Sequence, residues 1–319
     1  MKKSISLILT VISVLCIFSA CTTQKGTDKK LTVVTTIFPI YDWTMNILGD
    51  NAENTDVTML LSNGVDLHSF QPSASDIMKL SSCDIFIYIG GESDSWADDA
   101  LKEAVNQDMI VVNLLDALGN SVKEEEIVEG MEAEKNEAEI DEHIWLSLKN
   151  AAMLVNVIKD ALSKADPNNK TTYEANAENY VKKLAELDKK YQSVVDNSAK
   201  KALLFGDRFP FRYLTDDYGI EYYAAFSGCS AESEASFKTI TFLAQKLSEL
   251  SLNAILKTES SDAKIAEAIA SAANNKSVKI LSMDSMQSIT FDDVKNGENY
   301  IGIMEKNLGV LKDALEVTT

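Results

Sequence analysis

The stretch TTYEANAENYVKKLAELDKKYQSVVDN, residues 171–197, contains neither glycine nor proline. Its apolar residues recur near the helical period and charged residues fill the positions between them, which predicts one amphipathic helix over Lys170–Asn197. At about 1.5 Å of rise per residue, this helix would be roughly 40 Å long, enough to run the length of a lobe. It separates two parts of similar size, which we expect to be lobes at 31–167 and 200–319 joined by a linking helix at 168–199.

Short apolar runs alternate with helical patterns on both sides of the linking helix. Such alternation indicates βαβ units, in which helices cover both faces of a parallel sheet. We therefore expect an α/β fold of two Rossmann-like lobes with central parallel sheets, and ligands beyond the carboxyl ends of the strands. The expected strands are 31–36, 55–61, 84–90, 109–113, 202–205, 220–225, 253–258 and 278–282. The other expected helices are 39–48, 73–80, 96–106, 148–165, 210–218, 234–250, 262–273 and 299–316.

The N-terminus, MKKSISLILTVISVLCIFSAC, has the features of an export signal. Two lysines precede an almost uncharged apolar run over 4–18, and small residues stand before Cys21, which predicts a signal peptide at 1–20. The run is shorter than the roughly 20 residues that a membrane-spanning helix needs. Because the residues before Cys21 resemble a bacterial lipobox, we expect lipidation of Cys21, a tether at 21–30, and anchoring to the outer face of the cytoplasmic membrane.

Composition limits the partners and the chemistry. The 319 residues include 30 Lys and Arg and 49 Asp and Glu, a formal net charge of −19. No nucleic-acid partner is expected, because phosphate backbones are bound by clustered basic side chains, whereas an acidic chain suits cations. The chain has two histidines, His68 and His143, so a histidine-based site is limited to them. Cys83 and Cys229 lie in different predicted lobes and are expected to be free thiols.

The segment 123–142, KEEEIVEGMEAEKNEAEIDE, holds ten acidic residues in twenty. It is too charged and too poorly patterned for a core element, which predicts a solvated, disordered loop. Such a loop also attracts divalent cations non-specifically, so both interpretations are compatible.

Each histidine stands where a loop meets a regular element. His68 lies in GVDLHSFQPS, residues 64–73, just after the second expected strand, and His143 lies in DEHIWLS, residues 141–147, where the acidic segment meets a helix. A single histidine usually has a structural role or lies on the protein surface, but two histidines at such junctions, one beside an acidic segment, favour a metal site.

These two motifs resemble those of the metal-binding lipoproteins of bacterial ABC importers for zinc and manganese, G-[VI]-D-P-H-x-[FYW]-[EQ]-P-[ST] and D-P-H-[IVF]-W. VVTTIFPIY at 33–41, Met283–Met286 and Asn299–Leu308 are also similar to segments of that family, so the resemblance covers nearly all of 31–317. It implies an extracytoplasmic, monomeric protein that captures a divalent metal between two lobes and passes it to an ABC permease with its ATPase.

The chain departs from the family pattern at several positions. Leu67 and Glu142 stand where each motif usually has proline, and the segment before the second motif is rich in glutamate where zinc members carry histidine. Arg208 falls at the position of the family's third ligand. A guanidinium is a cation without a free lone pair, so Arg208 cannot bind a metal and the ligand set must be completed differently.

Three carboxylates are candidates to complete it. Asp284 matches a family ligand, Glu259 ends an expected strand where the family also has an acidic residue, and Asp207 lies beside Arg208. Alternatively, Asp207 pairs with an arginine and Glu259 supports a ligating histidine. Cys229 is either a soft donor or a small buried residue. Two imidazoles with one or two carboxylates suit Zn²⁺, with Mn²⁺ as the alternative.

Two other functions are alternatives to metal delivery. A metal-dependent hydrolase is not favoured, because the chain has no H-E-x-x-H, no G-x-S-x-G and no phosphate-binding glycine-rich loop, so we expect no enzymatic activity. A surface adhesin remains an alternative, although no repeat or apolar patch in the sequence supports it.

Overall fold

The computed structural model describes residues 30–132, 139–230, 234–273 and 277–317. The expected signal peptide, Cys21 and all of the tether except Lys30 lie outside the described residues. Among the helices of the described part, none combines the length and the apolar character needed to cross a membrane.

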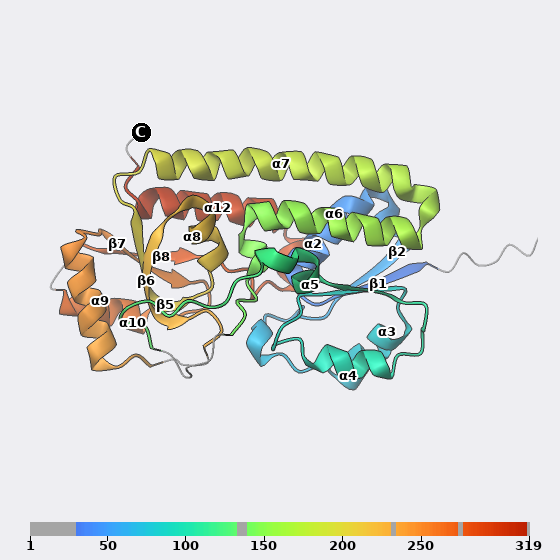
Figure 1. Cartoon of the computed structure of the whole chain (residues 1–319), viewed down its shortest axis with the longest axis horizontal. Helices are drawn as coiled ribbons and strands as arrows, with labels where there is room; N and C mark the ends of the chain where they lie inside the picture. Colours follow the sequence, from blue (N-terminus) through green and yellow to red (C-terminus); the bar gives the residue numbers. More distant parts are fainter. Residues whose placement is uncertain (1–29, 133–138, 231–233, 274–276, 318–319) are drawn as a thin grey trace, which may run out of the picture. The chain divides into compact units, whose positions relative to one another are not determined.

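The N-terminal lobe is built on a parallel sheet with the strand order β2-β1-β3-β4. Its strands are β1 (Leu31–Thr35), β2 (Thr55–Met59), β3 (Ile85–Tyr88) and β4 (Ile110–Asn113). Its main helices are α2 (Phe38–Leu48), α3 (Ala74–Ser82), α4 (Trp96–Lys102) and α6 (Leu148–Ala165). Figure 1 shows α2 and α6 on one face of this sheet and α3 and α4 on the other, as expected for apolar strands that are covered on both faces.

The C-terminal lobe repeats this arrangement with the strand order β6-β5-β7-β8, again fully parallel. Its strands are β5 (Ala202–Phe209), β6 (Glu221–Ser227), β7 (Ala254–Thr258) and β8 (Lys279–Met283). Its main helices are α8 (Arg212–Tyr218), α9 (Phe237–Glu249), α10 (Lys264–Ala272) and α12 (Tyr300–Ala314). The expected α/β fold with two parallel sheets is therefore confirmed.

All eight expected strands occur within a few residues of their expected bounds, and one difference affects the candidate site. Strand β5 continues to Phe209, four residues beyond the expected end, so that Asp207 and Arg208 belong to the strand. The pairing of β5 with β6 shifts register between Phe205 and Arg208, a local irregularity of the kind that redirects side chains at strand ends. The helices α5 (Leu114–Leu118) and α11 (Phe291–Lys295) were not expected, because five residues are too few for a periodic pattern.

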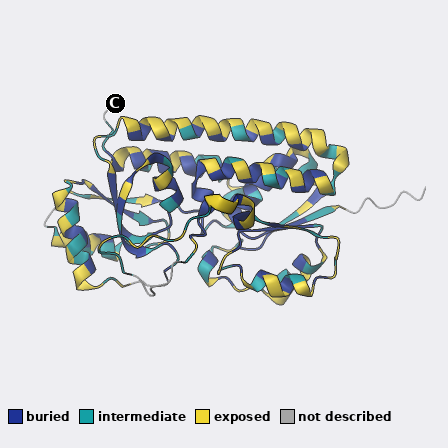
Figure 2. Cartoon of the chain, viewed as in Figure 1, coloured by how far each residue is buried: buried dark blue, intermediate teal, exposed yellow. Residues whose placement is uncertain are grey.

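The long helix expected from the sequence is α7 (Lys170–Asp196), and it runs past both sheets (Figure 1). Its inner side is buried and its outer side is exposed (Figure 2). The Tyr180 hydroxyl donates to Asp42 Oδ2 of α2 at 2.9 Å, and the Tyr191 hydroxyl donates to the Met304 carbonyl of α12 at 2.6 Å. One continuous apolar core contains residues of both lobes and of α7, so this helix ties the lobes together along its length.

A second connection between the lobes is made by Trp145, in the 3-10 turn Ile144–Leu146. Its side chain is fully buried, and its indole N–H donates to the Ser285 carbonyl at 2.9 Å. Its own carbonyl accepts a 2.6 Å hydrogen bond from the Tyr300 hydroxyl of α12. The segment that follows His143 is therefore held by groups of the C-terminal lobe.

The Asp42 carboxyl at the α2–α7 contact generates a test of this packing. It is only 8% exposed, and burial raises its pKa to about 6 despite the hydrogen bond from Tyr180. In the unfolded chain an aspartate ionises near pH ~4. Because the folded state binds this proton more tightly, the carboxyl stabilises the fold fully below about pH 4, and that contribution is lost as the pH rises through about 6.

We expect Asp42→Asn, which keeps an acceptor for Tyr180, to remove this loss. The difference in free energy of unfolding between the variant and the wild type should therefore be roughly 2–3 kcal/mol more in favour of the variant at about pH 8 than at about pH 4. Urea unfolding at both pH values measures the difference, with Asp50→Asn at an exposed position as the control. A parallel pH dependence in the wild type and Asp42→Asn would contradict the prediction.

Candidate metal centre

Both histidines are positioned by the same local turn. Asp66 Oδ1 accepts a hydrogen bond from the His68 backbone N–H at 3.0 Å, and Asp141 Oδ1 accepts one from the His143 N–H at 2.8 Å. An aspartate side chain that bonds to the backbone two residues later forms a compact turn and competes with regular structure. The D-x-H spacing of the two motifs therefore has a structural cause: it places His68 inside the short 3-10 turn Leu67–Ser69 and His143 directly before the 3-10 turn Ile144–Leu146.

The two imidazole rings face each other through their Nε2 atoms, which lie 3.3 Å apart. Their other ring nitrogens are engaged, because His68 Nδ1 lies 2.8 Å from Ser93 Oγ and His143 Nδ1 lies 3.0 Å from Asp141 Oδ1. Two zinc–imidazole bonds of about 2.0–2.1 Å at a tetrahedral angle separate their nitrogens by about 3.3 Å. The pair therefore already has the spacing of one edge of a tetrahedral site, with the rings oriented as outer hydrogen bonds orient metal-binding histidines.

The charges around the pair favour a free lone pair on His68. Burial, together with the proximity of His143, lowers the pKa of His68 to about 3. The pKa of His143 is raised instead: burial opposes its protonation, but Asp141, together with Glu142 and Glu125, outweighs that effect. Without a metal, a proton on His143 satisfies the short contact between the two Nε2 atoms, and a bound metal ion would displace it.

Glu142 belongs to the second motif, directly after Asp141, and its side chain lies beside His68 of the first motif. It is 2% exposed, and its Oε1 accepts a hydrogen bond from the Ser93 N–H at 3.0 Å. Its Oε2 has no hydrogen-bond partner and lies 3.9 Å from His68 Nδ1. This close approach needs Gly91, because a Cβ at that position would lie 2.3 Å from Glu142 Oε1. Burial raises the pKa of Glu142, and glutamate in place of the proline expected from the family motif thus puts a buried acidic group beside the two imidazoles.

The C-terminal lobe approaches the histidines with the segment after β6. A Cβ on Gly228 would lie 3.0 Å from His143 Cε1, so only glycine allows the backbone to pack this closely on the ring. The next residue is Cys229, and among the described residues His68, His143 and Cys229 form a cluster whose ligand atoms all lie within 4.8 Å of one another. Cys229 and Cys83 are both free thiols, as expected. The sequence alone did not decide whether Cys229 is a metal donor, because no pattern near it in the chain shows that it lies close to the histidines.

The structure does not bring the three candidate carboxylates into this cluster. They instead hold the loops at the carboxyl ends of their strands. Asp207 Oδ2 accepts hydrogen bonds from the N–H and hydroxyl of Thr258, at 2.8 and 2.6 Å. Glu259 Oε2 accepts from the Ser285 N–H at 2.8 Å. Asp284 Oδ1 accepts from the Met286 N–H at 2.7 Å, and burial, with the nearby Glu259, raises its pKa to about 6.

Arg208, expected from the resemblance at the position of the third ligand, forms an ion pair with Asp66 of the other lobe. Its Nη2 lies 2.8 Å from Asp66 Oδ2, while the other oxygen of Asp66 caps His68. Burial opposes ionisation of Asp66, but the guanidinium outweighs it and lowers the pKa of this carboxyl below its usual value. The alternative pairing of Asp207 with this arginine is limited to the Arg208 backbone N–H, which donates to Asp207 Oδ1 at 2.8 Å.

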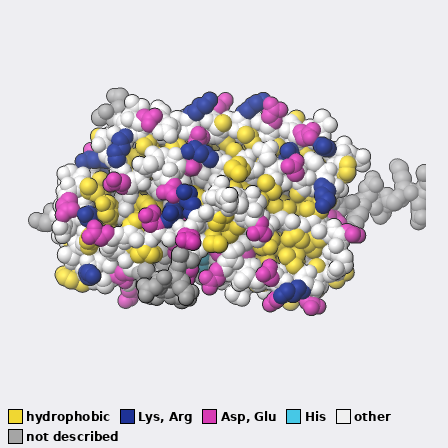
Figure 3. Space-filling model, in the orientation of Figure 1, with side chains coloured by type: hydrophobic (Ala, Val, Ile, Leu, Met, Phe, Trp, Pro, Cys, Tyr) yellow, Lys and Arg dark blue, Asp and Glu magenta, His cyan; other side chains and the backbone are white. Residues whose placement is uncertain are grey.

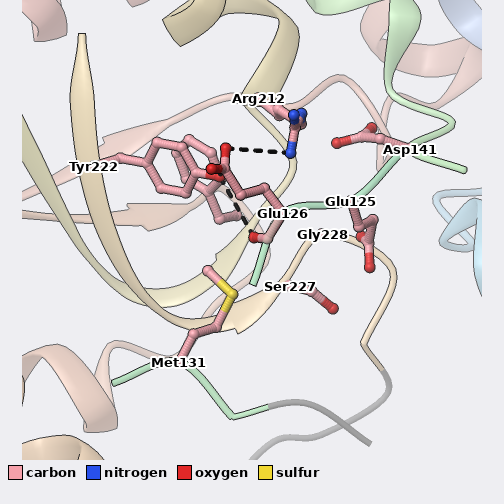
Figure 4. A pocket seen from close by; sticks show the side chains of 9 residues that line it. Glu125, Glu126, Met131, Asp141, Arg212, Tyr222, Ser227 and Gly228 are labelled. Carbon is pink, nitrogen blue, oxygen red and sulfur yellow. Dashed lines mark hydrogen bonds and ion pairs between the residues drawn. The ribbon is translucent and has the colours of Figure 1, made fainter. Parts of the chain in front are cut away.

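The acidic segment is more ordered than the sequence suggested. Glu126 forms an ion pair with Arg212, with Oε2 and Nη1 3.3 Å apart, and Tyr222 lies 3.5 Å from the same carboxylate, as Figure 4 shows. The Glu132 N–H donates to the Ala225 carbonyl at 2.9 Å. The expectation of a solvated, disordered loop is therefore wrong for the described parts, 123–132 and 139–142. The partners come from the C-terminal lobe, and composition alone does not show them.

Behind His143, the acidic segment and the C-terminal lobe enclose a cavity of about 10 Å³, which has room for a single water molecule. It is lined by Glu125, Glu126, Met131, Asp141, Phe209, Arg212, Tyr222, Ser227 and Gly228 (Figure 4). The site itself is nearly closed: His68 is 15% exposed and His143 is fully buried, so little histidine surface is visible among the acidic side chains in Figure 3.

Two parallel α/β lobes tied by one long helix, with imidazoles converging between them, define a two-lobed metal-binding protein. The chain belongs to the family described as "Zinc-uptake complex component A periplasmic", whose model matches residues 33–314. The zinc-binding lipoprotein AdcA of Streptococcus pneumoniae is 33% identical over 98% of this chain. The chain spans 61% of that relative's length.

Two further comparisons cover more of the related chain. The high-affinity zinc uptake system protein ZnuA of Bacillus subtilis is 30% identical, over 92% of this chain and 90% of its own length. The crystal structure of the Zn(II)-bound ZnuA-like domain of S. pneumoniae AdcA superposes with a TM-score of 0.71 at 29% identity, over 90% of this chain and 99% of that domain. The fold of the whole described body is therefore that of the family.

The ion pair between the lobes is testable by a double-mutant cycle of Arg208→Met and Asp66→Asn. The asparagine side chain would still cap the His68 turn, so the cycle isolates the pair. Both side chains are largely buried, at 21% and 25% exposure. We expect a coupling energy of about 1–2 kcal/mol, which lies between the values typical of exposed and of buried ion pairs. Free energies of unfolding of the four proteins measure it; additivity within roughly 0.5 kcal/mol would show that the pair contributes nothing.

Proposed function

We propose that the chain is an extracytoplasmic zinc-binding protein that captures Zn²⁺ between its lobes at His68 and His143 and delivers it to an ABC importer. The observation that carries the proposal is the 3.3 Å separation of the two Nε2 atoms, with both Nδ1 atoms held by Ser93 and Asp141. The relatives named for zinc binding and zinc uptake support the same metal.

Zinc is favoured over manganese by the donors near the histidines. Imidazole and sulfur suit Zn²⁺, whereas Mn²⁺ prefers carboxylate, carbonyl and water oxygens. The carboxylates of Asp207, Glu259 and Asp284, on which an oxygen-rich site would depend, are engaged by backbone N–H groups. They would have to give up those hydrogen bonds to bind a metal.

Delivery, not catalysis, follows from the family and from the closed site. We propose an ABC permease and its ATPase as partners, and a protein without enzymatic activity. The lobes should move little relative to each other on metal release. A wide opening would break the buried hydrogen bonds of Trp145 and the apolar core that both lobes share along α7. The adhesin and hydrolase alternatives have no such support in the described residues.

Substitution of the histidines tests the metal site. We expect His68→Ala and His143→Ala each to weaken zinc binding at least about 100-fold, because loss of an outer hydrogen-bond partner alone typically costs 10–100-fold. Equilibrium dialysis with metal analysis measures affinity and stoichiometry. In a deletion strain grown at limiting zinc, neither variant should restore zinc uptake, whereas the wild type should.

The matched controls are Asp207→Asn, Glu259→Gln and Asp284→Asn, which keep acceptors for the backbone hydrogen bonds. We expect each to change zinc affinity less than about tenfold. A loss of zinc affinity as large as that of His68→Ala would show that the substituted carboxylate is a metal ligand. Unchanged zinc binding in both histidine variants would refute the site.

We also propose that the mature protein is a lipoprotein anchored through Cys21, in line with the relative named as a lipoprotein. Cys21→Ala should abolish incorporation of labelled fatty acid and release the protein from membranes on fractionation. Cys16→Ala, a change inside the expected signal peptide, is the control and should leave both unchanged. Membrane retention of Cys21→Ala without fatty acid would show a different mode of attachment.

A further inference from the structure

We infer that Cys229 is the third protein ligand of the metal and that it closes the site from the C-terminal lobe as a thiolate. This inference rests on the proposed metal site at His68 and His143. Cys229 is the one residue of the C-terminal lobe in the cluster whose ligand atoms lie within 4.8 Å of one another among the described residues. The site then has two imidazoles and one sulfur, each lobe contributing to it.

The distances require only a small closure. With zinc–nitrogen bonds of about 2.0–2.1 Å and a zinc–sulfur bond of about 2.3 Å, a tetrahedral site places nitrogen and sulfur about 3.6 Å apart. The cluster limit of 4.8 Å leaves the sulfur at most about an ångström too far. Because the two Nε2 atoms already have their final spacing, the sulfur is the group that moves when the metal binds.

The segment that carries Cys229 is fixed against the site. Gly228 packs on the His143 ring, with its Cβ position 3.0 Å from Cε1 and 3.1 Å from Nδ1. The Cys229 N–H donates to Glu125 Oε1 at 2.7 Å, and Glu125 and Gly228 line the same small cavity (Figure 4). The acidic segment therefore orients the cysteine, which gives its ordered part a role at the metal site.

A second observation indicates that this cluster is built for a cation. Glu142 is 2% exposed, yet its Oε2 has no hydrogen-bond partner and lies 3.9 Å from His68 Nδ1. A buried carboxylate oxygen without a partner is costly unless a positive charge lies nearby. A divalent ion held by His68, His143 and Cys229 provides that charge.

Binding converts a thiol into a metal thiolate. The metal–sulfur bond forms as the sulfur–hydrogen bond breaks, and the proton leaves to solvent, with the Glu125 carboxyl group, which binds the Cys229 backbone N–H, as an acceptor beside the cysteine. Since thiolate is a soft ligand, it strengthens binding of Zn²⁺ and Cd²⁺ more than binding of Mn²⁺. Cys229 thus determines metal specificity where Arg208 has taken the place of a third imidazole.

The Co²⁺-loaded protein tests this assignment. A cobalt–thiolate bond produces an intense charge-transfer band in the near ultraviolet that nitrogen and oxygen ligands do not produce. We expect the band in the wild type and in Cys83→Ser, a control at the buried free thiol outside the cluster, and we expect it to be lost in Cys229→Ser. Competition titrations should show zinc affinity about 10–100-fold lower in Cys229→Ser, with a smaller change for Mn²⁺.

A measurement on the wild type avoids any effect of the substitution on folding. Zinc should protect Cys229 from alkylation by iodoacetamide, as followed by peptide mass spectrometry. Absence of the cobalt band in the wild type, zinc affinity unchanged in Cys229→Ser, or alkylation unaffected by zinc would each overturn the assignment. These outcomes leave the histidine site intact, whereas unchanged zinc binding in His68→Ala and His143→Ala overturns the proposed function itself.

Discussion

The buried hydrogen bonds of Trp145 connect the fold to the site. Its indole N–H binds the Ser285 carbonyl and its own carbonyl accepts from Tyr300, so a residue two positions after His143 is held by the C-terminal lobe. Helix α7 extends this connection, because its tyrosines bond to α2 on one side and to α12 on the other. The distance between the lobes at the metal site is therefore set by core packing and not by a flexible linker.

Within that fixed frame, the histidines are held in an arrangement that is unfavourable without a positive charge. Two Nε2 atoms 3.3 Å apart repel unless a proton or a metal ion lies between them, and their Nδ1 atoms cannot turn away without losing Ser93 or Asp141. The buried carboxyl groups of Asp141 and Glu142 also lie beside the pair. A divalent cation relieves all of these constraints together, which accounts for a preorganised site that needs little movement.

The polar residues near the strand ends of the C-terminal lobe have different roles. In the C-terminal lobe the carboxylates of Asp207, Glu259 and Asp284 accept hydrogen bonds from backbone N–H groups and shape the loops. The same lobe places Arg208 against Asp66 and Cys229 beside His143. A cation therefore stands where the family resemblance leads us to expect a ligand, and the thiol in the histidine cluster comes from the segment that follows the neighbouring strand β6.

The two parallel sheets, α7 and the turns that present His68 and His143 depend on residues close in the chain, because periodicity and the D-x-H spacing act over short separations. The sequence also limits the imidazoles to two. Two features follow from long-range packing instead: among the described residues Cys229, and not Asp207, Glu259 or Asp284, lies with the histidines, and the acidic segment packs on the C-terminal lobe. Those contacts join residues about 85 to 160 positions apart, whose proximity depends on strand order and core packing and leaves no local pattern.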